Sequence, residues 1–228
     1  MLRRKRCWFL FGCFLNLLHH QRPGFLSFPA SHATPYLRGN KYPVENFPTL
    51  YEYRDVETRL IKKVTRTLRQ DFGLNSQIDR VVRLSNAQNI VIKPASIDCV
   101  ITSPPYMSGL AYARDNRLRL WFCGVGNWLD LEKQVTPART AFVKLMNESG
   151  YLWQTWLRPK GFAAIVLGDI HQDKKRVDVA LLVLDSIKRH APLLSLVSCE
   201  DQSIPDEKRL IKGNAGTLTE TTLIFRRR

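Results

Sequence analysis

Four residues that can bind a flat, amino-bearing molecule stand together directly after an apolar run. The run Ile97–Thr102 is followed by Ser103, Pro104, Pro105 and Tyr106. Each proline fixes its φ angle and lacks a backbone N–H, so the neighbouring carbonyl oxygens are held in set directions. The serine hydroxyl and these carbonyls can accept the hydrogens of an NH₂ group, and a ring can stack on the tyrosine. The spacing predicts a rigid loop for a planar amine.

The apolar run in front of this loop is typical of a buried strand in the middle of a parallel sheet. Open α/β sheets bind their ligands at the carboxyl ends of such strands, which is where the loop begins. A stiff turn or an exposed polyproline-type recognition motif is the alternative interpretation of Pro-Pro-Tyr. Its position immediately after a buried strand favours a binding site.

The rest of the chain alternates between helical and strand patterns. Apolar residues at three- and four-residue spacing predict a helix that begins after Asp55 and ends at Gly73. Further helices are expected at 111–124, from Thr136-Pro137 toward Leu157, and at 177–190. Strands are expected at 79–85, 96–102, 162–169, 193–199 and 217–225. This alternation predicts an α/β sheet in a three-layered domain.

Composition restricts the partners and the ligands. The 228 residues carry 35 Lys and Arg against 20 Asp and Glu, a net charge of +15, which favours a polyanionic partner. Nucleic acid is the first candidate, and a membrane surface or incidental basicity remains open. The five cysteines form no CxxC pair and the five histidines have no metal-ligand spacing, so we expect no metal site and no disulfide scaffold.

The first 50 residues differ from the rest. A basic start precedes the apolar run Cys7–Leu18, which is formally a signal-peptide pattern with Ala30–Ala33 as a cleavage site. A packed helix, or unselected sequence in front of the domain, explains the run equally well. Five prolines between Gln21 and Leu50 then indicate an extended linker.

Three segments together resemble a known family. "TSPPY" (Thr102–Tyr106) matches the signature loop of the amino-group DNA methyltransferases, which modify cytosine N4 or adenine N6 and often belong to restriction-modification systems. "YARDNRLRLWFCG" (Tyr112–Gly124) and "WLRPKGFAAIVLGD" (Trp156–Asp169) are similar to later segments of one bacterial group of that family. The resemblance spans roughly residues 75–228 and implies a Rossmann-like sheet, DNA as substrate and S-adenosylmethionine as methyl donor.

The resemblance also implies roles for individual residues. Ser103 and Pro104 would bind the amino group, Pro105 would stiffen the loop, and Tyr106 would stack on a base flipped out of the duplex. Serine at the first position leans toward cytosine. Thr102 and Asn86, the latter in "SNAQN", are assigned to the cofactor, and a turn or helix cap is an equal interpretation of Asn86.

DNA contacts are expected from two basic groups, for which ordinary surface charge is an even alternative. The first lies near the loop in sequence and the second follows Asp169. The residues are Arg114, Arg117, Arg119, Lys174, Lys175 and Arg176.

A glycine-rich loop that would hold the cofactor is not visible, because Gly124 and Gly126 follow a helix and indicate a helix stop. We therefore expect an incomplete sheet without its first two strands, with residues 1–50 as an atypical segment and 51–228 as the methyltransferase domain. Three hypotheses remain open. The chain is a truncated or split enzyme whose cofactor half is on a second chain, or residues 1–50 form an unorthodox cofactor lobe, or the chain is a non-catalytic DNA-binding remnant. A DNA-modifying role makes the signal-like pattern an accident and predicts the cytoplasm of a bacterium or archaeon, with no membrane partner.

Overall fold

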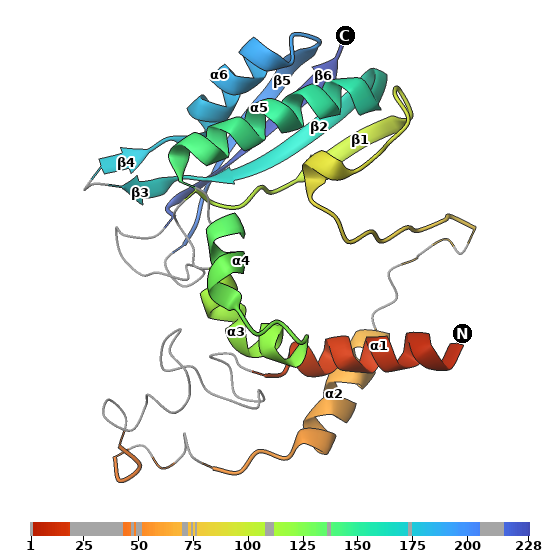
Figure 1. Ribbon diagram of the computed structural model, residues 1–228, viewed down its shortest axis with the longest axis vertical. Coiled ribbons are helices and arrows are strands. Elements are labelled where there is room, and N and C mark those ends of the chain that lie inside the picture. The colour runs from red at the N-terminus through yellow and green to blue at the C-terminus, as the bar shows by residue number, and fades with distance from the viewer. Residues whose placement is uncertain are drawn as a thin grey trace. The chain divides into compact units, whose positions relative to one another are not determined.

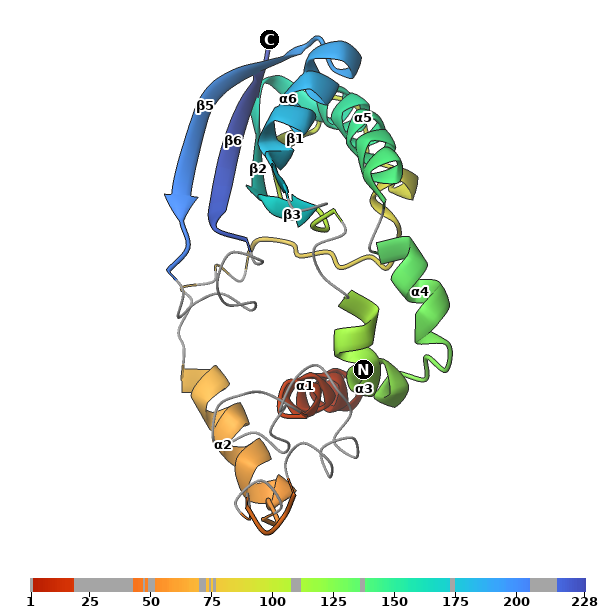
Figure 2. The ribbon, with the colours of Figure 1, turned by 90° about the vertical axis from the view of Figure 1, so that its left-hand side faces the viewer.

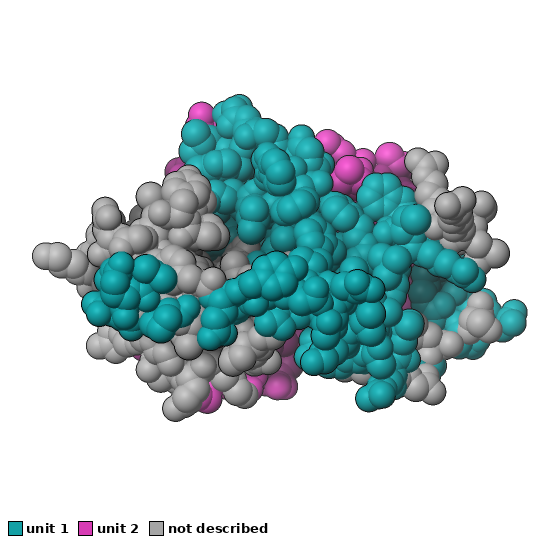
Figure 3. Space-filling view, turned by 90° about the horizontal axis from the view of Figure 1, so that it is seen from below, with its two compact units in different colours: residues 1–81, 113–131 teal, residues 82–112, 132–228 magenta. Residues whose placement is uncertain are grey.

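The computed structural model describes two compact units. It describes residues 2–18, 43–46, 48, 52–69, 73, 75, 77–107, 112–135, 138–172, 175–205 and 217–228. The helical unit consists of Met1–Val81 and Ala113–Leu131, and the sheet unit of Val82–Tyr112 and Glu132–Arg228 (Figure 3). The loop Ser103–Tyr106 therefore belongs to the sheet unit.

Four strands form the main sheet, in the order β1-β2-β6-β5 (Figure 1). β1 and β2 are parallel, whereas β6 runs antiparallel to both β2 and β5. A second ladder contains only β3 and β4. The bounds are Ile97–Thr102 (β1), Leu157–Gly168 (β2), Ile170–Gln172 (β3), Lys175–Val177 (β4), Leu194–Ser203 (β5) and Thr219–Arg227 (β6).

Two helices cover the same face of this sheet, as Figures 1 and 2 show. α5 (Arg139–Trp156) leads from the segment after β1 into β2, and α6 (Val179–His190) leads from β4 to β5. Asp178 caps α6, because its carboxylate accepts the Leu181 N–H at 3.1 Å. A β-carbon at Gly150 of α5 would lie 2.5 Å from Ile187 Cδ1, so glycine allows the two helices to approach closely.

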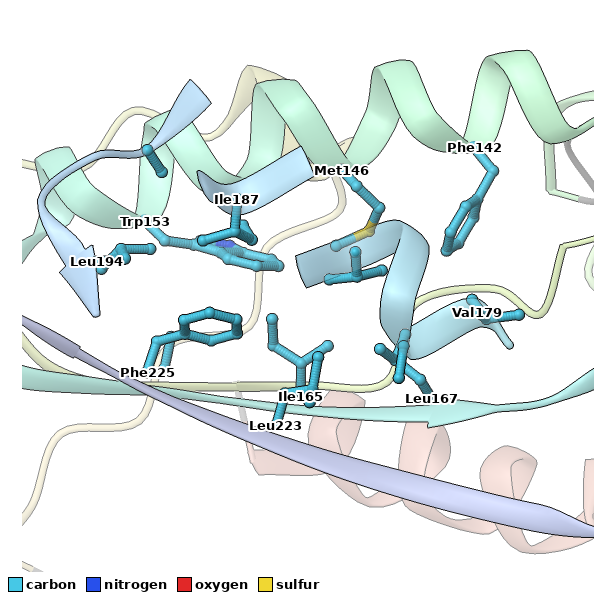
Figure 4. Packing of buried hydrophobic residues seen from close by; sticks show 14 of the residues in the cluster. Phe142, Met146, Trp153, Ile165, Leu167, Val179, Ile187, Leu194, Leu223 and Phe225 are labelled. Carbon is cyan, nitrogen blue, oxygen red and sulfur yellow. The ribbon is translucent and has the colours of Figure 1, made fainter. Parts of the chain in front are cut away.

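The core lies between these helices and the sheet (Figure 4). Side chains alternate across a strand, and β2 accordingly buries Ala163, Ile165 and Leu167 while Phe162 remains 41% exposed. Residues from both helices and from β6 complete the core: Phe142, Met146, Trp153, Val183, Ile187, Leu223 and Phe225.

This topology confirms the predicted α/β class with an incomplete Rossmann-like sheet. Parallel strands joined by helices form one half, and an antiparallel strand is inserted between β2 and β5. The expected third layer is not found, because within the described part of the sheet unit the helices α5 and α6 share one face.

Two predictions about strands are wrong for the same physical reason. Residues 79–85 were expected to form a strand, but they have no strand partner among the described residues, and Val82 and Leu84 are fully exposed. β1 was expected in the middle of the sheet, yet β2 is its only neighbour in the described sheet and Ile101 is 79% exposed. Neither segment has the neighbours that its expected place requires, because a strand needs at least one partner and a central strand needs a neighbour on each side.

The described residues of the helical unit form four helices. They are α1 (Leu2–Leu15), α2 (Val56–Arg69), α3 (Tyr112–Phe122) and α4 (Trp128–Val135), of which α3 and α4 each extend past the boundary of the unit. The Phe14 and Phe122 rings meet edge to face at 4.9 Å, and Arg119 Nε donates to the Leu15 carbonyl at 3.0 Å. The apolar run near the amino terminus thus lies largely in a helix whose second half packs, with Cys13 buried and Trp8 63% exposed. This agrees with the packed-helix alternative, and the other two alternatives stay open.

No helix among the described residues is both long and apolar enough to span a bilayer. The predicted helix after Asp55 is confirmed as α2, and the Asp55 carboxylate accepts the Thr58 N–H at 2.6 Å. The expected helix start at Thr136-Pro137 lies outside the described residues, and α5 begins at Arg139.

Candidate active site

The loop Ser103–Tyr106 lies at the carboxyl end of β1, beside the carboxyl end of the parallel strand β2. Pro104 is buried and Met107 has no exposed surface, so the loop is anchored in the core on both sides of Pro105. Ser103 is exposed and Tyr106 is half-buried. The prolines therefore stiffen the backbone of a short segment whose first residue, Ser103, is exposed.

Tyr106 is held by three contacts from different parts of the sheet unit. Its hydroxyl donates to Glu220 Oε1 at 2.7 Å, and its backbone N–H donates to the Tyr112 hydroxyl at 3.0 Å. Its ring lies against Gly168, where an added β-carbon would be 2.4 Å from Cε2 of the tyrosine. The ring is thus fixed in position and is not a freely exposed stacking face.

The pKa of Tyr106 is raised well above its ordinary value. Burial is the largest cause, and the hydrogen bond to Glu220 and the charge of that carboxylate act in the same direction. A hydrogen bond with Ser103 acts weakly in the opposite direction. The phenol therefore remains protonated at neutral pH and keeps its hydrogen available for Glu220.

Antiparallel pairing brings Glu220 to this place. Because β6 runs opposite to β2, its first residues lie beside the last residues of β2, and Gly168 is in register with Glu220. Asp169 fixes this start of β6, since its Oδ1 accepts the backbone N–H groups of Leu218 (2.8 Å) and Thr219 (3.2 Å). Asp169 also forms an ion pair with Arg176.

This arrangement can bind a group that carries N–H donors. The exposed Ser103 hydroxyl and the rigid loop provide acceptors, and the half-buried ring of Tyr106 provides an apolar surface beside them. Hydrogen bonds from an NH₂ group to such acceptors strengthen as the nitrogen gains positive charge during alkylation.

The expected DNA-binding arginines of α3 do not belong to the same unit as the loop. Arg114, Arg117 and Arg119 lie in the helical unit. Arg114 pairs with Asp115 at 3.5 Å, and Arg119 is occupied with the Leu15 carbonyl and Asn116; burial lowers the pKa of its guanidinium. Their proposed contact with DNA stays a prediction.

The second basic group divides into three different cases. Lys174 lies outside the described residues, and Lys175 is exposed on β4. Arg176 pairs with Asp169, so its charge already stabilises the segment that leads into β6. Arg176 therefore has a structural role, whereas its role toward phosphate stays a prediction.

The two residues assigned to the cofactor lie apart in the fold. Thr102 ends β1 and is half-buried. Asn86 is exposed, precedes the short 3₁₀ helix η3 (Ala87–Asn89), and its carbonyl accepts the Asn89 N–H at 2.9 Å. Gln88 beside it reaches Glu148 of α5 at 3.5 Å.

A cavity of about 550 Å³ lies next to Gln88. It is lined by Gln88, Asn147, Glu148, Tyr151, Leu152 and His190. His190 ends α6, which leads to the amino end of β5, so this cavity is at the end of the sheet opposite the loop. The structure does not bring the Asn86 segment to Ser103, and the cofactor role of Asn86 stays a prediction.

Sequence reasoning missed Glu220, Gly168 and Tyr112. The separation of 114 residues between Tyr106 and Glu220 hides their contact from any local pattern. Among the described residues, no group of three potential metal ligands comes together.

Among known proteins, the chain is similar only to solved structures. No model of a protein family matches the sequence, and no curated protein matches it. A proposed DNA modification methylase of Thermus thermophilus, complexed with S-adenosyl-L-methionine, is 17% identical with a TM-score of 0.40, over 63% of this chain and 51% of that one.

Two further solved structures have similarly low sequence identities and TM-scores. The PvuII DNA methyltransferase, described as cytosine-N4-specific, is 17% identical with a TM-score of 0.37, over 59% of this chain and 44% of that one. A SAM-dependent methyltransferase of Methanosarcina mazei is 9% identical with a TM-score of 0.36, over 75% and 78%. The chain spans about half the length of the DNA methylases that it matches. The fold assignment rests on the strand order described above.

Proposed function

We propose that this chain is the base-handling part of an amino-group DNA methyltransferase, which transfers a methyl group to cytosine N4 or adenine N6. S-adenosylmethionine would supply the methyl group. The observation that carries the proposal is the rigid loop at the end of β1, which exposes Ser103 while Tyr106 is fixed beside it by Glu220 and Gly168. The serine form of the loop favours cytosine, as in restriction-modification enzymes.

The residues of the loop have separate roles in this proposal. The Ser103 hydroxyl and the Pro104 carbonyl accept hydrogen bonds from the amino group and direct the nitrogen lone pair toward the methyl donor. Pro105 keeps the loop stiff. A target base must leave the duplex to reach these groups, and it would then lie against the Tyr106 ring.

The described residues do not form a site that fits S-adenosylmethionine. Asn86 lies toward the opposite end of the sheet unit from the loop, and the segment 79–85 in front of it is exposed and forms no strand. The sequence also lacks a glycine-rich turn after a strand that precedes β1. We therefore derive no step through the cofactor from these residues.

The direct test is transfer of a labelled methyl group from S-adenosylmethionine to DNA. Digestion of the product to nucleosides and mass spectrometry separate N4-methylcytosine from N6-methyladenine. Base stacking on an aromatic ring is worth about 1–3 kcal/mol, so Tyr106→Ala should reduce transfer by about 5- to 150-fold. Tyr53→Ala is a matched control, since Tyr53 is 87% exposed and lies outside the sheet unit. Intact transfer in Tyr106→Ala would remove Tyr106 from the site.

A second candidate is a split enzyme, in which another chain supplies the cofactor half and this chain alone binds DNA without activity. The free side of β1 in the described sheet favours it, because an edge strand leaves a row of backbone N–H and C=O groups with which a further strand can pair. Calorimetry with S-adenosylmethionine on this chain alone separates the two candidates. Micromolar binding supports a cofactor site within the chain, whereas DNA binding without it supports the split form.

A further inference from the structure

We propose that one face of helix α2 binds the phosphate backbone of duplex DNA, independently of base sequence and of the loop Ser103–Tyr106. The inference rests on the proposed function for the identity of its polyanionic partner. α2 belongs to the helical unit and precedes residues 75–228, the part of the chain that resembles the DNA methyltransferases. The resemblance therefore gives α2 no role.

Three cations of α2 form one row along the helix. Lys62, Arg66 and Arg69 follow one another at intervals of four and three residues, which places their side chains on the same face. All three residues are exposed. At about 1.5 Å per residue, the row is about 10 Å long. One strand of a duplex carries a phosphate about every 3.4 Å along the axis, so the row can follow about three phosphates.

The remaining residues of α2 keep this row free of acidic and apolar neighbours. Leu60 and Val64 lie on the side of the helix away from the row and are half-buried, and α1 contacts α2 within the helical unit. Glu57 is the single acidic residue of α2 and is in its first turn. A carboxylate at that place complements the helix dipole. The row itself carries cations alone.

No carboxylate compensates the charge of the row. Its three cations form no ion pair with any residue that the structure describes. On α6, by contrast, Arg189 pairs with Asp185 at 2.7 Å. Like charges three and four residues apart repel one another and destabilise a helix. A bound polyanion removes this repulsion, so the row is complementary in charge to a phosphate backbone.

An anionic lipid surface is the other polyanion that a basic amphipathic helix can bind, and the apolar side of α2 favours DNA over it. Helices that lie on lipid insert aromatic and large apolar side chains from a free face. α2 contains no aromatic residue. Ile61 and Leu68 are exposed, at 58% and 69%, but Leu60 and Val64 between them are half-buried. Phosphate contacts need cations and no apolar insertion, which is what the row offers.

Two double variants with the same net charge test the row. Lys62→Gln with Arg66→Gln, the α2 variant, removes two of its cations, and the helix should stay folded because glutamine has a high helix propensity. Lys93→Gln with Lys188→Gln, the control variant, removes two exposed lysines of the sheet unit. Circular dichroism should give both variants the helix content of the wild type.

The readout is the affinity of the full chain for a duplex of about 20 base pairs, measured by fluorescence anisotropy between about 50 and 200 mM salt. Each neutralised phosphate contributes about 0.9 to the slope of log K against log salt concentration, so the slope of the α2 variant should be shallower by about 1.8. At about 0.1 M salt its binding should be up to about 60-fold weaker. The control variant should keep the wild-type slope.

Four results would overturn the inference. They are an unchanged slope in the α2 variant, an equal change of slope in both variants, a change of slope that depends on the sequence of the duplex, and loss of binding to phosphatidylserine vesicles without a change of slope on DNA. The last result would assign the row to lipid. A second duplex of unrelated sequence should give the same change of slope, because phosphate contacts carry no sequence information.

The inference and the proposed function fail separately. Tyr106→Ala leaves the cations of α2 in place, so it should reduce methyl transfer and keep the wild-type slope. Methyl transfer to amino groups with an unchanged slope in the α2 variant would overturn the inference and leave the proposed function standing. A shallower slope in the α2 variant of a chain that transfers no methyl group supports the inference whatever becomes of the proposed function.

Discussion

Replacement of Gly168 by alanine tests the geometry of the candidate site most directly. The added β-carbon would lie 2.4 Å from Cε2 and 2.9 Å from Cζ of Tyr106, and 2.9 Å from Cγ2 of Thr217. Carbon atoms in contact prefer about 3.5–4.0 Å, so the ring would have to retreat by about 1 Å. A retreat directed away from Glu220 would stretch the 2.7 Å hydrogen bond to about 3.7 Å, beyond hydrogen-bond range.

Two costs follow from this retreat. Overpacking of this kind typically lowers the free energy of unfolding by about 1–3 kcal/mol, which urea unfolding followed by circular dichroism can measure. Loss of the bond to Glu220 also releases the Tyr106 ring from its fixed position. We therefore expect the rate of methyl transfer, or the affinity for an oligonucleotide if the chain alone does not transfer methyl groups, to fall by more than the loss of folded protein explains.

Two controls make the result decisive. Gly126→Ala adds the same methyl group where nothing lies within 4 Å, so its effect on stability should stay within about 0.5 kcal/mol. In a Tyr106→Ala background the main clash is gone and the contact with Thr217 remains, so Gly168→Ala should cost much less there. An equal cost in both backgrounds, or no cost in the wild type, would refute the assigned position of the ring.

Two further predictions concern charged groups. Arg176→Ala should lower the free energy of unfolding by about 1–2 kcal/mol, because it leaves Asp169 without its ion pair. Lys175→Ala should change the free energy of unfolding by less than about 0.5 kcal/mol, since Lys175 is exposed. Urea unfolding measures both values, and equal losses would contradict the structural role of Arg176. Asp55 caps α2, and the side-chain and backbone hydrogen bonds of Thr58 lower the pKa of the Asp55 carboxyl. The charged cap therefore stabilises the helix above the ordinary aspartate pKa, and this contribution is lost as the pH falls through the lowered pKa of the folded state. Circular dichroism between pH 7 and pH 2 should show this loss in the wild type and not in Asp55→Asn, which keeps an uncharged cap; parallel curves would contradict it.

The elements with strong local signals were predictable from the sequence. The apolar run that became β2 and the periodic segment that became α2 carry their own pattern, so each formed the predicted type of element, although β2 begins five residues earlier than expected and α2 ends at Arg69. The rigid loop after β1 was equally local, because two prolines dictate its backbone whatever surrounds it. Its place at the carboxyl end of a parallel strand then followed from the α/β alternation.

The failures were not local. Residues 79–85 have the composition of a strand, but a strand forms only where a neighbour offers hydrogen bonds, and composition does not reveal whether that neighbour is present. The ion pair of Arg176 was not foreseen, because its partner Asp169 becomes adjacent only when β3 and β4 fold back as a hairpin; its contact with phosphate stays a prediction. Glu220 was missed because antiparallel pairing across the sheet brings it to Tyr106.

These pairings also explain how the described residues can hold the proposed base site together without forming a cofactor site themselves. The groups that hold Tyr106 come from the end of β2 and the start of β6, and the loop itself follows β1. All three strands belong to the described sheet, and their register alone brings Glu220 and Gly168 to the ring. The free side of β1 is where further parallel strands would add their own carboxyl ends, and with them a cofactor site. A strand added there would extend the site without changing the pairing that positions Ser103 and Tyr106, so the two halves can be separated in the sequence and still meet at one edge of the sheet.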